Sequence, residues 1–227
     1  MTLDIKICGL KTEEALDAAL SGGATHVGFI FFEKSPRNVD ADTAAALAAK
    51  ARQKLAVPVV VTVDADDAAL AEIIATVQPG MLQLHGDEPP ERVADVRAKF
   101  GLPVMKALAI RDAADLEKIV PYRGIADRFL FDAKAPAGSE LPGGNGISFD
   151  WRLLDAVDRD VDYMLSGGLD PENVAEAVVI SGARALDVSS GVESAPGVKD
   201  KGRITAFLRA ARAADPQNRE IEHEQAG

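Results

Sequence analysis

Cysteine is almost absent from this sequence. Cys8 is the single cysteine among 227 residues. One thiol cannot form a disulfide within the chain, and it cannot supply the several thiolates of a cysteine-based zinc site. The first residues, Met1 to Lys6, lack the basic-then-apolar layout of a secretory signal. We therefore expect a protein of the reducing cytoplasm.

Long apolar runs and excess positive charge are also missing. No apolar run approaches the ~20 residues that a membrane-spanning helix needs. The chain has 25 Lys and Arg residues against 36 Asp and Glu residues, a formal net charge of −11. Nucleic acids and anionic membrane surfaces are bound through basic fields, so neither is expected as a partner. A small anionic substrate stays possible, because it needs only a local cluster of donors.

The sequence does contain short β-branched runs that alternate with alanine-rich helical stretches. The predicted strands are Leu3–Cys8, His26–Phe32, Val57–Asp64, Met81–His85, Val104–Ala109, Arg128–Asp132, Asp162–Ser166 and Ala183–Ser189. Helical stretches are predicted to begin near Thr12, Asp40, Ala65, Pro89, Arg111, Phe149, Pro171 and Lys199. Asp170 before Pro171 has the pattern of a helix N-cap followed by proline at the first helical position.

This alternation predicts an α/β fold. Repeated strand–helix units of roughly 28 residues indicate a parallel sheet with helices outside it, and eight of them fit a closed (β/α)₈ TIM barrel. An open doubly wound sheet is the alternative, but no Gly-x-Gly-x-x-Gly opens the first turn. We expect one barrel domain over residues 1–214 and a polar, frayed tail over 215–227. The glycine- and proline-rich segment 134–147 is either a plain connection or a loop that closes over a ligand.

Strand alternation assigns several polar side chains to the barrel interior, mostly at the C-terminal ends where active sites of this fold lie. They are Lys6, Cys8, Gln83, His85, Lys106, Asp132, Asp187 and Ser189. One alternative is a structural ion-pair network, and for Cys8 alone it is a small buried apolar group. The number of acid–base types at one mouth favours an active site.

Two glycine-rich loops follow the last two predicted strands. Ser166-Gly167-Gly168-Leu169 follows one, and Ser189-Ser190-Gly191 follows the other. Glycine lets backbone N–H groups approach an anion, and this end of a TIM barrel commonly holds phosphate. Arg37 lies on a loop after the second strand, where an arginine either pairs with a carboxylate or is merely solvated. Both loops could also be ordinary turns, but their shared position favours a phosphate site.

Taken together, these motifs resemble the phosphoribosylanthranilate isomerase family over nearly the whole chain, from Lys6 to about Lys201. The motifs are Lys6-Ile7-Cys8-Gly9, Gly28-Phe29-Ile30-Phe31, Ser35-Pro36-Arg37, Leu82-Gln83-Leu84-His85-Gly86, Phe131-Asp132, Gly143-Gly144-Asn145-Gly146, Ser166-Gly167-Gly168-Leu169, Asp187-Val188-Ser189-Ser190-Gly191-Val192-Glu193 and Pro196-Gly197-Val198-Lys199-Asp200. The resemblance implies an isomerase of tryptophan biosynthesis. It implies an Amadori rearrangement of a phosphosugar without cofactor or metal.

The resemblance also implies roles for individual residues. Asp132 is implied as the general acid and Cys8 as the general base, with Lys6 lowering the pKa of the thiol. Arg37 is implied to hold the anthranilate carboxylate. The residues implied to bind phosphate are Gly167, Gly168, Ser189, Ser190 and Gly191. His85 and Asp187 are implied to contact sugar hydroxyls or to order the acid–base groups.

Two alternative functions remain open from the sequence. One is another phosphosugar enzyme of the same fold, an indole-glycerol-phosphate synthase or the histidine-pathway isomerase. The other is a phosphosugar-binding protein without catalysis, which has no need of Cys8 together with Asp132. The oligomeric state, monomer or homodimer, is not fixed by any sequence pattern.

Overall fold

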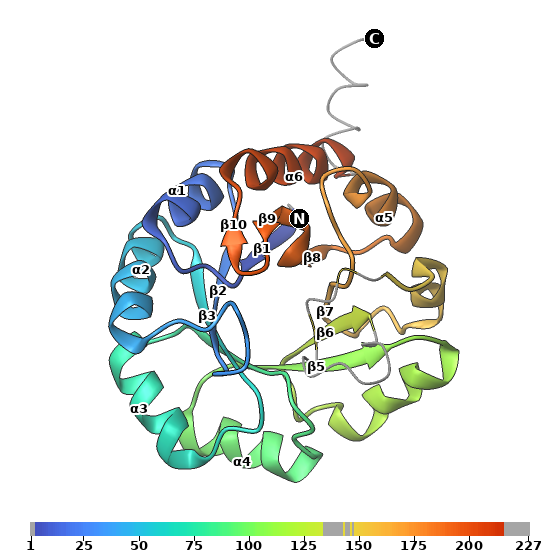
Figure 1. Ribbon diagram of the computed structural model, residues 1–227. Coiled ribbons are helices and arrows are strands. Elements are labelled where there is room, and N and C mark those ends of the chain that lie inside the picture. The colour runs from blue at the N-terminus through green and yellow to red at the C-terminus, as the bar shows by residue number, and fades with distance from the viewer. Residues whose placement is uncertain (1–2, 134–142, 144–145, 147, 216–227) are drawn as a thin grey trace.

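The computed structural model describes residues 3–133, 143, 146 and 148–215. Eight parallel strands form a closed barrel in sequence order, with β1 paired to both β2 and β8 (Figure 1). The strands are β1 (Asp4–Cys8), β2 (His26–Phe31), β3 (Val57–Thr62), β4 (Met81–Leu84), β5 (Val104–Ile110), β6 (Arg128–Ala133), β7 (Tyr163–Leu165) and β8 (Ala185–Val188). The predicted TIM barrel is confirmed.

Helical segments surround the barrel as an outer ring (Figure 1). The segments are α1 (Glu13–Ser21), α2 (Ala41–Gln53), α3 (Asp67–Val77), α4 (Pro90–Phe100), η1 (Ala113–Tyr122), η2 (Trp151–Ala156), α5 (Val174–Ser181) and α6 (Lys201–Ala214). The first two begin where expected, because the side chains of Thr12 and Asp40 accept hydrogen bonds from backbone N–H groups three residues on.

Three helical segments differ from the prediction. The segments η1 and η2, expected as helices from near Arg111 and Phe149, are 3₁₀ helices. Pro121 inside η1 has no N–H to donate, which disfavours an α-helix there. The helix expected from Pro171 begins only at Val174, with Asn173 as its N-cap.

Asp170 closes a turn before that helix instead of capping it. Its Oδ1 accepts hydrogen bonds from the N–H groups of Glu172 (2.9 Å) and Asn173 (2.8 Å). The Asn173 amide then donates to the carbonyl of Gly168 at 2.8 Å. This turn therefore fixes the loop that follows β7.

A small hairpin at the barrel mouth was not predicted. After the short 3₁₀ segment η3 (Ser190–Val192), strands β9 (Glu193–Ala195) and β10 (Val198–Lys199) pair antiparallel. In Figure 1 the hairpin lies over the end of the barrel where β1 and β8 meet.

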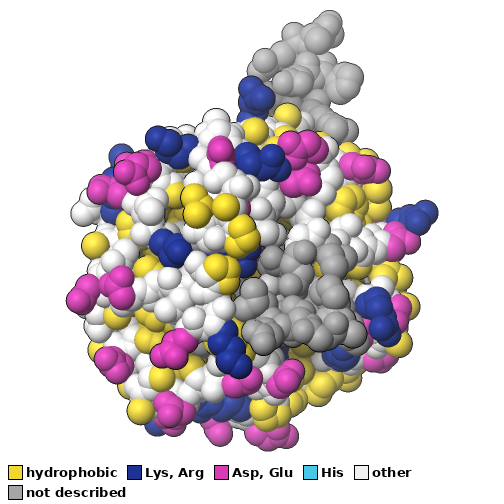
Figure 2. Space-filling model, viewed as in Figure 1, with side chains coloured by type: hydrophobic (Ala, Val, Ile, Leu, Met, Phe, Trp, Pro, Cys, Tyr) yellow, Lys and Arg dark blue, Asp and Glu magenta, His cyan; other side chains and the backbone are white. Residues whose placement is uncertain are grey.

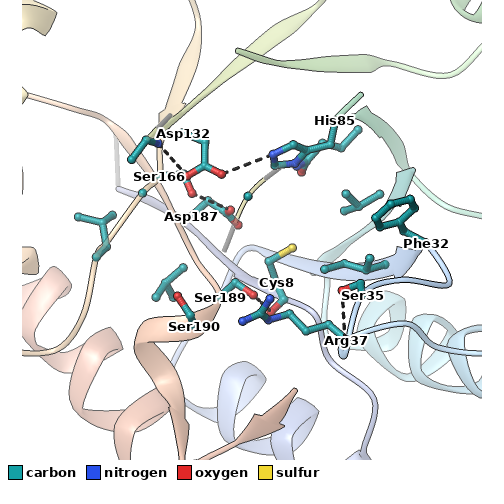
Figure 3. A pocket seen from close by; sticks show the side chains of 18 of the residues that line it. Cys8, Phe32, Ser35, Arg37, His85, Asp132, Ser166, Asp187, Ser189 and Ser190 are labelled. Atoms are coloured by element: carbon teal, nitrogen blue, oxygen red, sulfur yellow. Dashed lines mark hydrogen bonds and ion pairs between the residues drawn. The ribbon is translucent and has the colours of Figure 1, made fainter. Parts of the chain in front are cut away.

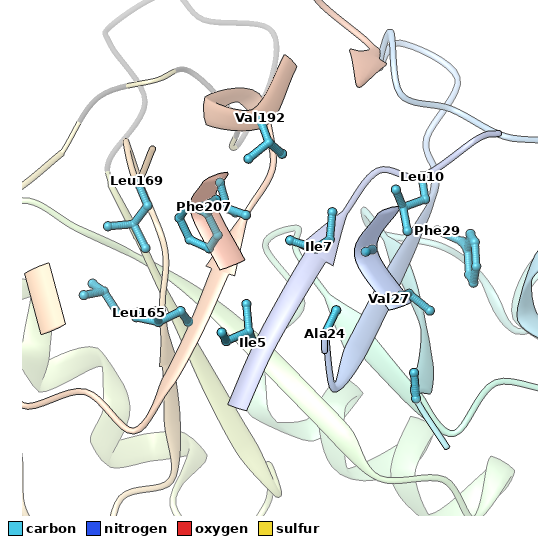
Figure 4. Close-up of a cluster of buried hydrophobic side chains, with 14 of the residues drawn as sticks. Ile5, Ile7, Leu10, Ala24, Val27, Phe29, Leu165, Leu169, Val192 and Phe207 are labelled. Carbon is cyan, nitrogen blue, oxygen red and sulfur yellow. The ribbon is translucent and has the colours of Figure 1, made fainter. Parts of the chain in front are cut away.

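The core has an outer and an inner layer. The outer layer packs the strands against the helices, and in Figure 4 it includes Ile5, Ile7, Val27, Phe29 and Leu165. The inner layer fills the barrel with Met105, Ala107, Leu130, Met164 and Ala185. Burying one large aliphatic side chain stabilises the fold by about 1.5–3 kcal/mol. The alternation predicted for β1, β4, β6 and β8 is confirmed by these two layers.

Lys106 does not face the barrel mouth, and its predicted place in the interior cluster is wrong. Met105 and Ala107 of β5 point inward, so Lys106 points toward the helix layer together with Val104 and Leu108. Its Nζ pairs with Glu88 Oε2 at 2.8 Å and donates to the carbonyl of Gly86 at 2.6 Å. This pairing offsets the cost of burying the charge.

Asp215, the first residue of the expected tail, still contacts the barrel. Asp215 is buried, and its Oδ2 accepts a hydrogen bond from the Leu3 N–H at 3.0 Å. Residues 216–227 and most of 134–147 lie outside the described residues, so the frayed tail and the closing loop stay predictions. Within the described part of the chain, no helix is long and apolar enough to cross a membrane.

On the face shown in Figure 2, acidic and basic side chains are interspersed around the rim. A broad field of one sign is not seen among the described residues on this face.

Candidate active site

A cavity opens at the C-terminal ends of the strands (Figure 3). Most of the residues predicted to form the site line it: Cys8, Arg37, His85, Asp132, Gly167, Gly168, Asp187, Ser189 and Ser190. Lys6 and Gly191 are not among the residues that line it. The structure therefore brings together the residues that the sequence assigned to one site.

Lys6 and Asp187 form a buried ion pair beneath the cavity. Parallel pairing of β1 with β8 places the two residues opposite each other, and Lys6 Nζ lies 2.8 Å from Asp187 Oδ1. The hydroxyl of Ser166 donates to Asp187 Oδ2 at 3.2 Å. Burial lowers the pKa of Lys6, but the charges and hydrogen bonds of Asp187 and Cys8 together outweigh burial, so the pKa of Lys6 is raised.

Burial raises the pKa of the Cys8 thiol above its usual value. Lys6 lowers this pKa, as expected, but Asp187 raises it, so the two charges of the pair oppose each other. The expected lowering by Lys6 is present, but burial outweighs it, so the net pKa of the thiol is raised. Lys199 adds a second lowering effect on the thiol pKa.

Asp132, the last residue but one of β6, lies on the other side of the cavity and belongs to a short chain of polar side chains. His85 Nε2 lies 3.4 Å from Asp132 Oδ2. The Gln83 amide nitrogen lies 2.9 Å from His85 Nδ1. With Gln83 as donor, Nδ1 is the acceptor and the ring proton sits on Nε2, facing Asp132. The Ala133 N–H donates to Asp132 Oδ1 at 2.9 Å, so Asp132 is held in place from both sides.

Gly143 approaches this acid closely. A Cβ at that position would overlap Asp132 Oδ2 and would lie 2.8 Å from His85 Nε2. Only glycine fits between the cavity and these two side chains without displacing them.

Arg37 is buried in the cavity wall, not solvated on a loop. Its Nε and Nη2 donate to the two carboxylate oxygens of Glu193 at 2.8 and 2.9 Å. This bidentate geometry fixes the guanidinium plane. A Cβ at Gly9, whose φ is +77°, would lie 2.9 Å from Arg37 Cδ, so the turn after β1 packs directly on the arginine.

Two further residues at the site were missed. Lys199 Nζ lies 2.7 Å from Glu193 Oε1 and donates to the Ser189 carbonyl at 2.9 Å. The Ser189 hydroxyl donates in turn to the Cys8 carbonyl at 3.2 Å. Glu193 and Lys199 lie in motifs of the family resemblance, but only the β9–β10 hairpin brings them to Arg37. A barrel prediction that ends with β8 does not contain that hairpin.

The loops after β7 and β8 pack against each other at one end of the cavity. Gly167 and Gly168 both have positive φ, +88° and +65°. A Cβ at Gly191 would overlap the Leu169 carbonyl, so the loop after β8 packs directly against the backbone of the loop after β7. This close packing of two glycine-rich backbones is suited to an anion.

Comparison with known proteins identifies the family. The model of the family "N-(5'phosphoribosyl)anthranilate (PRA) isomerase" matches residues 5–210. The chain belongs to the PRA isomerase family. A PRA isomerase from Brucella canis is 65% identical over 217 residues, which cover 96% of this chain and 97% of that relative.

Solved PRA isomerase structures share the fold. The crystal structure of the Thermotoga maritima PRA isomerase is 34% identical with a TM-score of 0.83, covering 93% of this chain and 100% of that one. A PRA isomerase crystallised with reduced 1-(o-carboxyphenylamino)-1-deoxyribulose 5-phosphate is 30% identical with a TM-score of 0.81, over the same shares of the two chains. The family and the fold expected from the sequence are thus confirmed, and the alternative barrel enzymes receive no support.

Proposed function

We propose that this chain converts N-(5-phosphoribosyl)anthranilate into 1-(2-carboxyphenylamino)-1-deoxyribulose 5-phosphate in tryptophan biosynthesis, with Cys8 as general base and Asp132 as general acid. One observation carries the assignment of roles. A thiol from β1 and a carboxyl from β6 line the same cavity in a member of the PRA isomerase family. A protein that only binds a phosphosugar has no need of this pair.

Asp132 acts first in this scheme. Its proton goes to the furanose ring oxygen, the bond between that oxygen and C1 breaks, and the open chain forms a Schiff base with the anthranilate nitrogen. The contact between His85 Nε2 and Asp132 Oδ2 supports the acid by fixing its orientation. His85 is thus proposed to order the acid.

Cys8 acts second. Its thiolate removes the proton from C2, and the electron pair moves to form the C1–C2 double bond of an enolamine. A proton then adds at C1 and the C2 hydroxyl loses its proton, which gives the ketone. The two groups lie on strands that three pairings separate along one side of the closed barrel, so they can reach different parts of one sugar.

Other residues that line the cavity are proposed to bind the two charged ends of the substrate, the carboxylate and the phosphate. Arg37 is proposed to hold the anthranilate carboxylate. The loops with Gly167, Gly168, Ser189, Ser190 and Gly191 are proposed to hold the phosphate. Asp187 has both oxygens engaged by Lys6 and Ser166, which favours an ordering role over contact with sugar hydroxyls. A cytoplasmic location, a monomer or homodimer, and catalysis without metal or cofactor stay predictions.

The test is a fluorescence assay that follows the loss of N-(5-phosphoribosyl)anthranilate. We expect the unaltered chain to consume it and Cys8→Ala and Asp132→Asn each to lower kcat by on the order of 10² or more. Asp162→Asn is the matched control, because Asp162 pairs with Arg128 before β7, at the far end of the barrel from the mouth. Circular dichroism checks the folding of all three variants. Near-normal turnover by either site variant would contradict the assigned role.

A further inference from the structure

Gln83 belongs to the chain of polar side chains that ends at Asp132, but the proposed function gives it no role. Its amide contacts His85, and His85 contacts Asp132. We propose that Gln83 is a positioning residue: its amide holds the ring proton of His85 on Nε2, so that His85 cannot take the proton that Asp132 donates to the substrate. The consequence for turnover rests on the proposed function, whereas the tautomer of His85 in the free protein does not.

The surroundings of Gln83 are unfavourable for an amide. The residue is 1% exposed, and its neighbours across the two strand pairings of β4 are the buried apolar residues Val61 and Met105. Its Oε1 is buried and has no hydrogen-bond partner among the described residues. Burying an unpartnered amide oxygen opposes folding, and an apolar side chain here would avoid that penalty. The other end of the amide, its nitrogen, contacts His85, so the role of this residue lies there.

The amide nitrogen determines which ring nitrogen of His85 carries the proton. Gln83 Nε2 lies 2.9 Å from His85 Nδ1. An amide nitrogen only donates, so the lone pair of Nδ1 must face it, and the proton of the neutral ring lies on Nε2. A doubly protonated ring is also opposed, because its Nδ1–H would meet the amide N–H, donor against donor.

His85 is held so that Nε2 faces the acid. The residue follows β4 directly, and its backbone N–H donates to the carbonyl of Thr62 at 2.8 Å, which continues the pairing with β3. In Figure 3 the ring of His85 faces Asp132, and Nε2 lies 3.4 Å from Oδ2. This distance is longer than an ordinary hydrogen bond, and contacts between catalytic groups often shorten only when substrate is bound.

The tautomer determines where the proton of Asp132 goes. With a proton on Nε2, His85 offers Asp132 no lone pair, and the acid keeps its proton for a group in the cavity. The Ala133 N–H donates to Oδ1 and the His85 Nε2–H faces Oδ2, so the carboxylate left after the transfer has a donor at each oxygen. With the proton on Nδ1 instead, the lone pair of Nε2 would compete with the furanose oxygen for the proton of the acid.

The tautomer of His85 is measurable in the free protein. The chain has three histidines, and nitrogen-15 NMR distinguishes protonated from unprotonated ring nitrogens in each of them. Comparison with His85→Asn assigns the signals of His85. We expect the neutral ring of the unaltered protein to carry its proton on Nε2.

Gln83→Glu replaces the amide donor by a carboxylate of the same shape, which accepts a hydrogen bond from Nδ1. We expect Nδ1 to become protonated. Either the neutral ring then accepts from Asp132, or a cationic ring favours the Asp132 carboxylate, and both states slow the proton transfer. We expect kcat/KM for N-(5-phosphoribosyl)anthranilate to fall at least about tenfold. Because ring opening is the step that slows, deuterium at C2 should give an isotope effect close to unity.

Gln83→Met keeps the length of the side chain and removes the hydrogen bond. We expect both tautomers of His85 to be populated and the loss in kcat/KM to be smaller than in Gln83→Glu. Gln53→Glu is the matched control, because it makes the same chemical change at the exposed last residue of α2. It should leave the tautomer and the turnover unchanged. Circular dichroism checks folding, and if Gln83→Glu does not fold, Gln83→Met carries the test.

The proposal is overturned if the neutral ring of the unaltered protein carries its proton on Nδ1. It is also overturned if folded Gln83→Glu keeps Nδ1 unprotonated, or turns over as fast as Gln53→Glu. Equal losses of activity in Gln83→Glu and Gln83→Met without a change of tautomer would indicate a purely structural role and would overturn it as well. The NMR results do not depend on turnover, so near-normal activity of Asp132→Asn would count against the proposed function alone.

Discussion

Lys6 Nζ lies 2.8 Å from Asp187 Oδ1, with the side chains 0 and 5% exposed. The two residues come from opposite ends of the described chain and meet only because β8 closes the barrel against β1. Asp187 also lines the cavity, so the pair that joins β1 to β8 also fixes the position of a residue in the cavity wall.

Breaking this pair from one side is expected to destabilise the barrel. Lys6→Met leaves Asp187 as a buried charge with only Ser166 as a side-chain donor, and we expect a loss of about 3–5 kcal/mol in the free energy of unfolding. Lys6→Met with Asp187→Leu removes both charges and should lose clearly less. Urea unfolding measures both variants. A double variant that loses as much as Lys6→Met, or more, would contradict this coupling.

His26 is expected to make stability depend on pH. Burial lowers its pKa to about 4, with Asp4 and Asp187 raising it and Arg128 and Lys6 lowering it further. The unfolded chain, with a histidine pKa near ~6.5, therefore binds more protons than the fold in this range. The neutral ring contributes its full stability above pH ~6.5, and this contribution is lost as pH falls toward ~4, by about 2–3 kcal/mol.

Urea unfolding at a series of pH values checks the His26 prediction. His26→Gln removes the titrating ring and is expected to flatten the slope between these two pKa values. Carboxylates titrate in the same range, so the comparison is between the two proteins at each pH. Equal slopes would show that His26 does not carry the dependence.

Leu55 is expected to be a site of stored strain on the surface. It is 92% exposed and has a φ of +62°, a conformation that costs a residue with a Cβ about 1–2 kcal/mol. Leu55→Gly should be more stable than Leu55→Ala by about 1 kcal/mol, because alanine keeps the Cβ. Thermal unfolding of the two variants measures the difference. An alanine variant as stable as the glycine variant would rule out strain at this position.

Gly191 is expected to be necessary for the phosphate end of the cavity. Because a Cβ there would overlap the Leu169 carbonyl, Gly191→Ala must separate the two glycine loops. We expect KM for the phosphosugar to rise at least about tenfold, with a smaller change in kcat, since the acid and base lie elsewhere. Gly202→Ala is the control, because its Cβ would meet nothing closer than Asp200 Oδ1 at 3.1 Å. An unchanged KM would place the phosphate somewhere else.

Strand alternation predicted most of the cavity wall from the sequence. It placed Cys8, His85 and Asp132 correctly, because each lies at the end of a short strand whose outward residues are apolar. It failed at Lys106, where the inward residues of β5 are the apolar Met105 and Ala107. The one charged side chain of β5, Lys106, lies on the outward face, so a charged residue on a strand does not by itself mark the inward face.

The β9–β10 hairpin and the ion pair of Arg37 could not be predicted, because both depend on contacts between residues that lie far apart in the sequence. The sequence left open whether Arg37 is paired or solvated, because its partner, Glu193, lies 156 residues away along the chain. Likewise, the pKa of the Cys8 thiol could not be judged from Lys6 alone, since burial raises it and Asp187 raises it further from another strand. Charge pairing across a closed barrel depends on three-dimensional neighbours.

The most direct test of the assigned roles is a kinetic isotope effect on kcat/KM, measured with N-(5-phosphoribosyl)anthranilate carrying deuterium at C2. Asp132→Asn slows ring opening, which does not break the C2–H bond, so the account predicts an isotope effect close to unity. Cys8→Ser slows removal of the C2 proton, so the account predicts a large primary isotope effect. Isotope effects that are equal in the two variants, or reversed between them, would contradict Cys8 as the base and Asp132 as the acid.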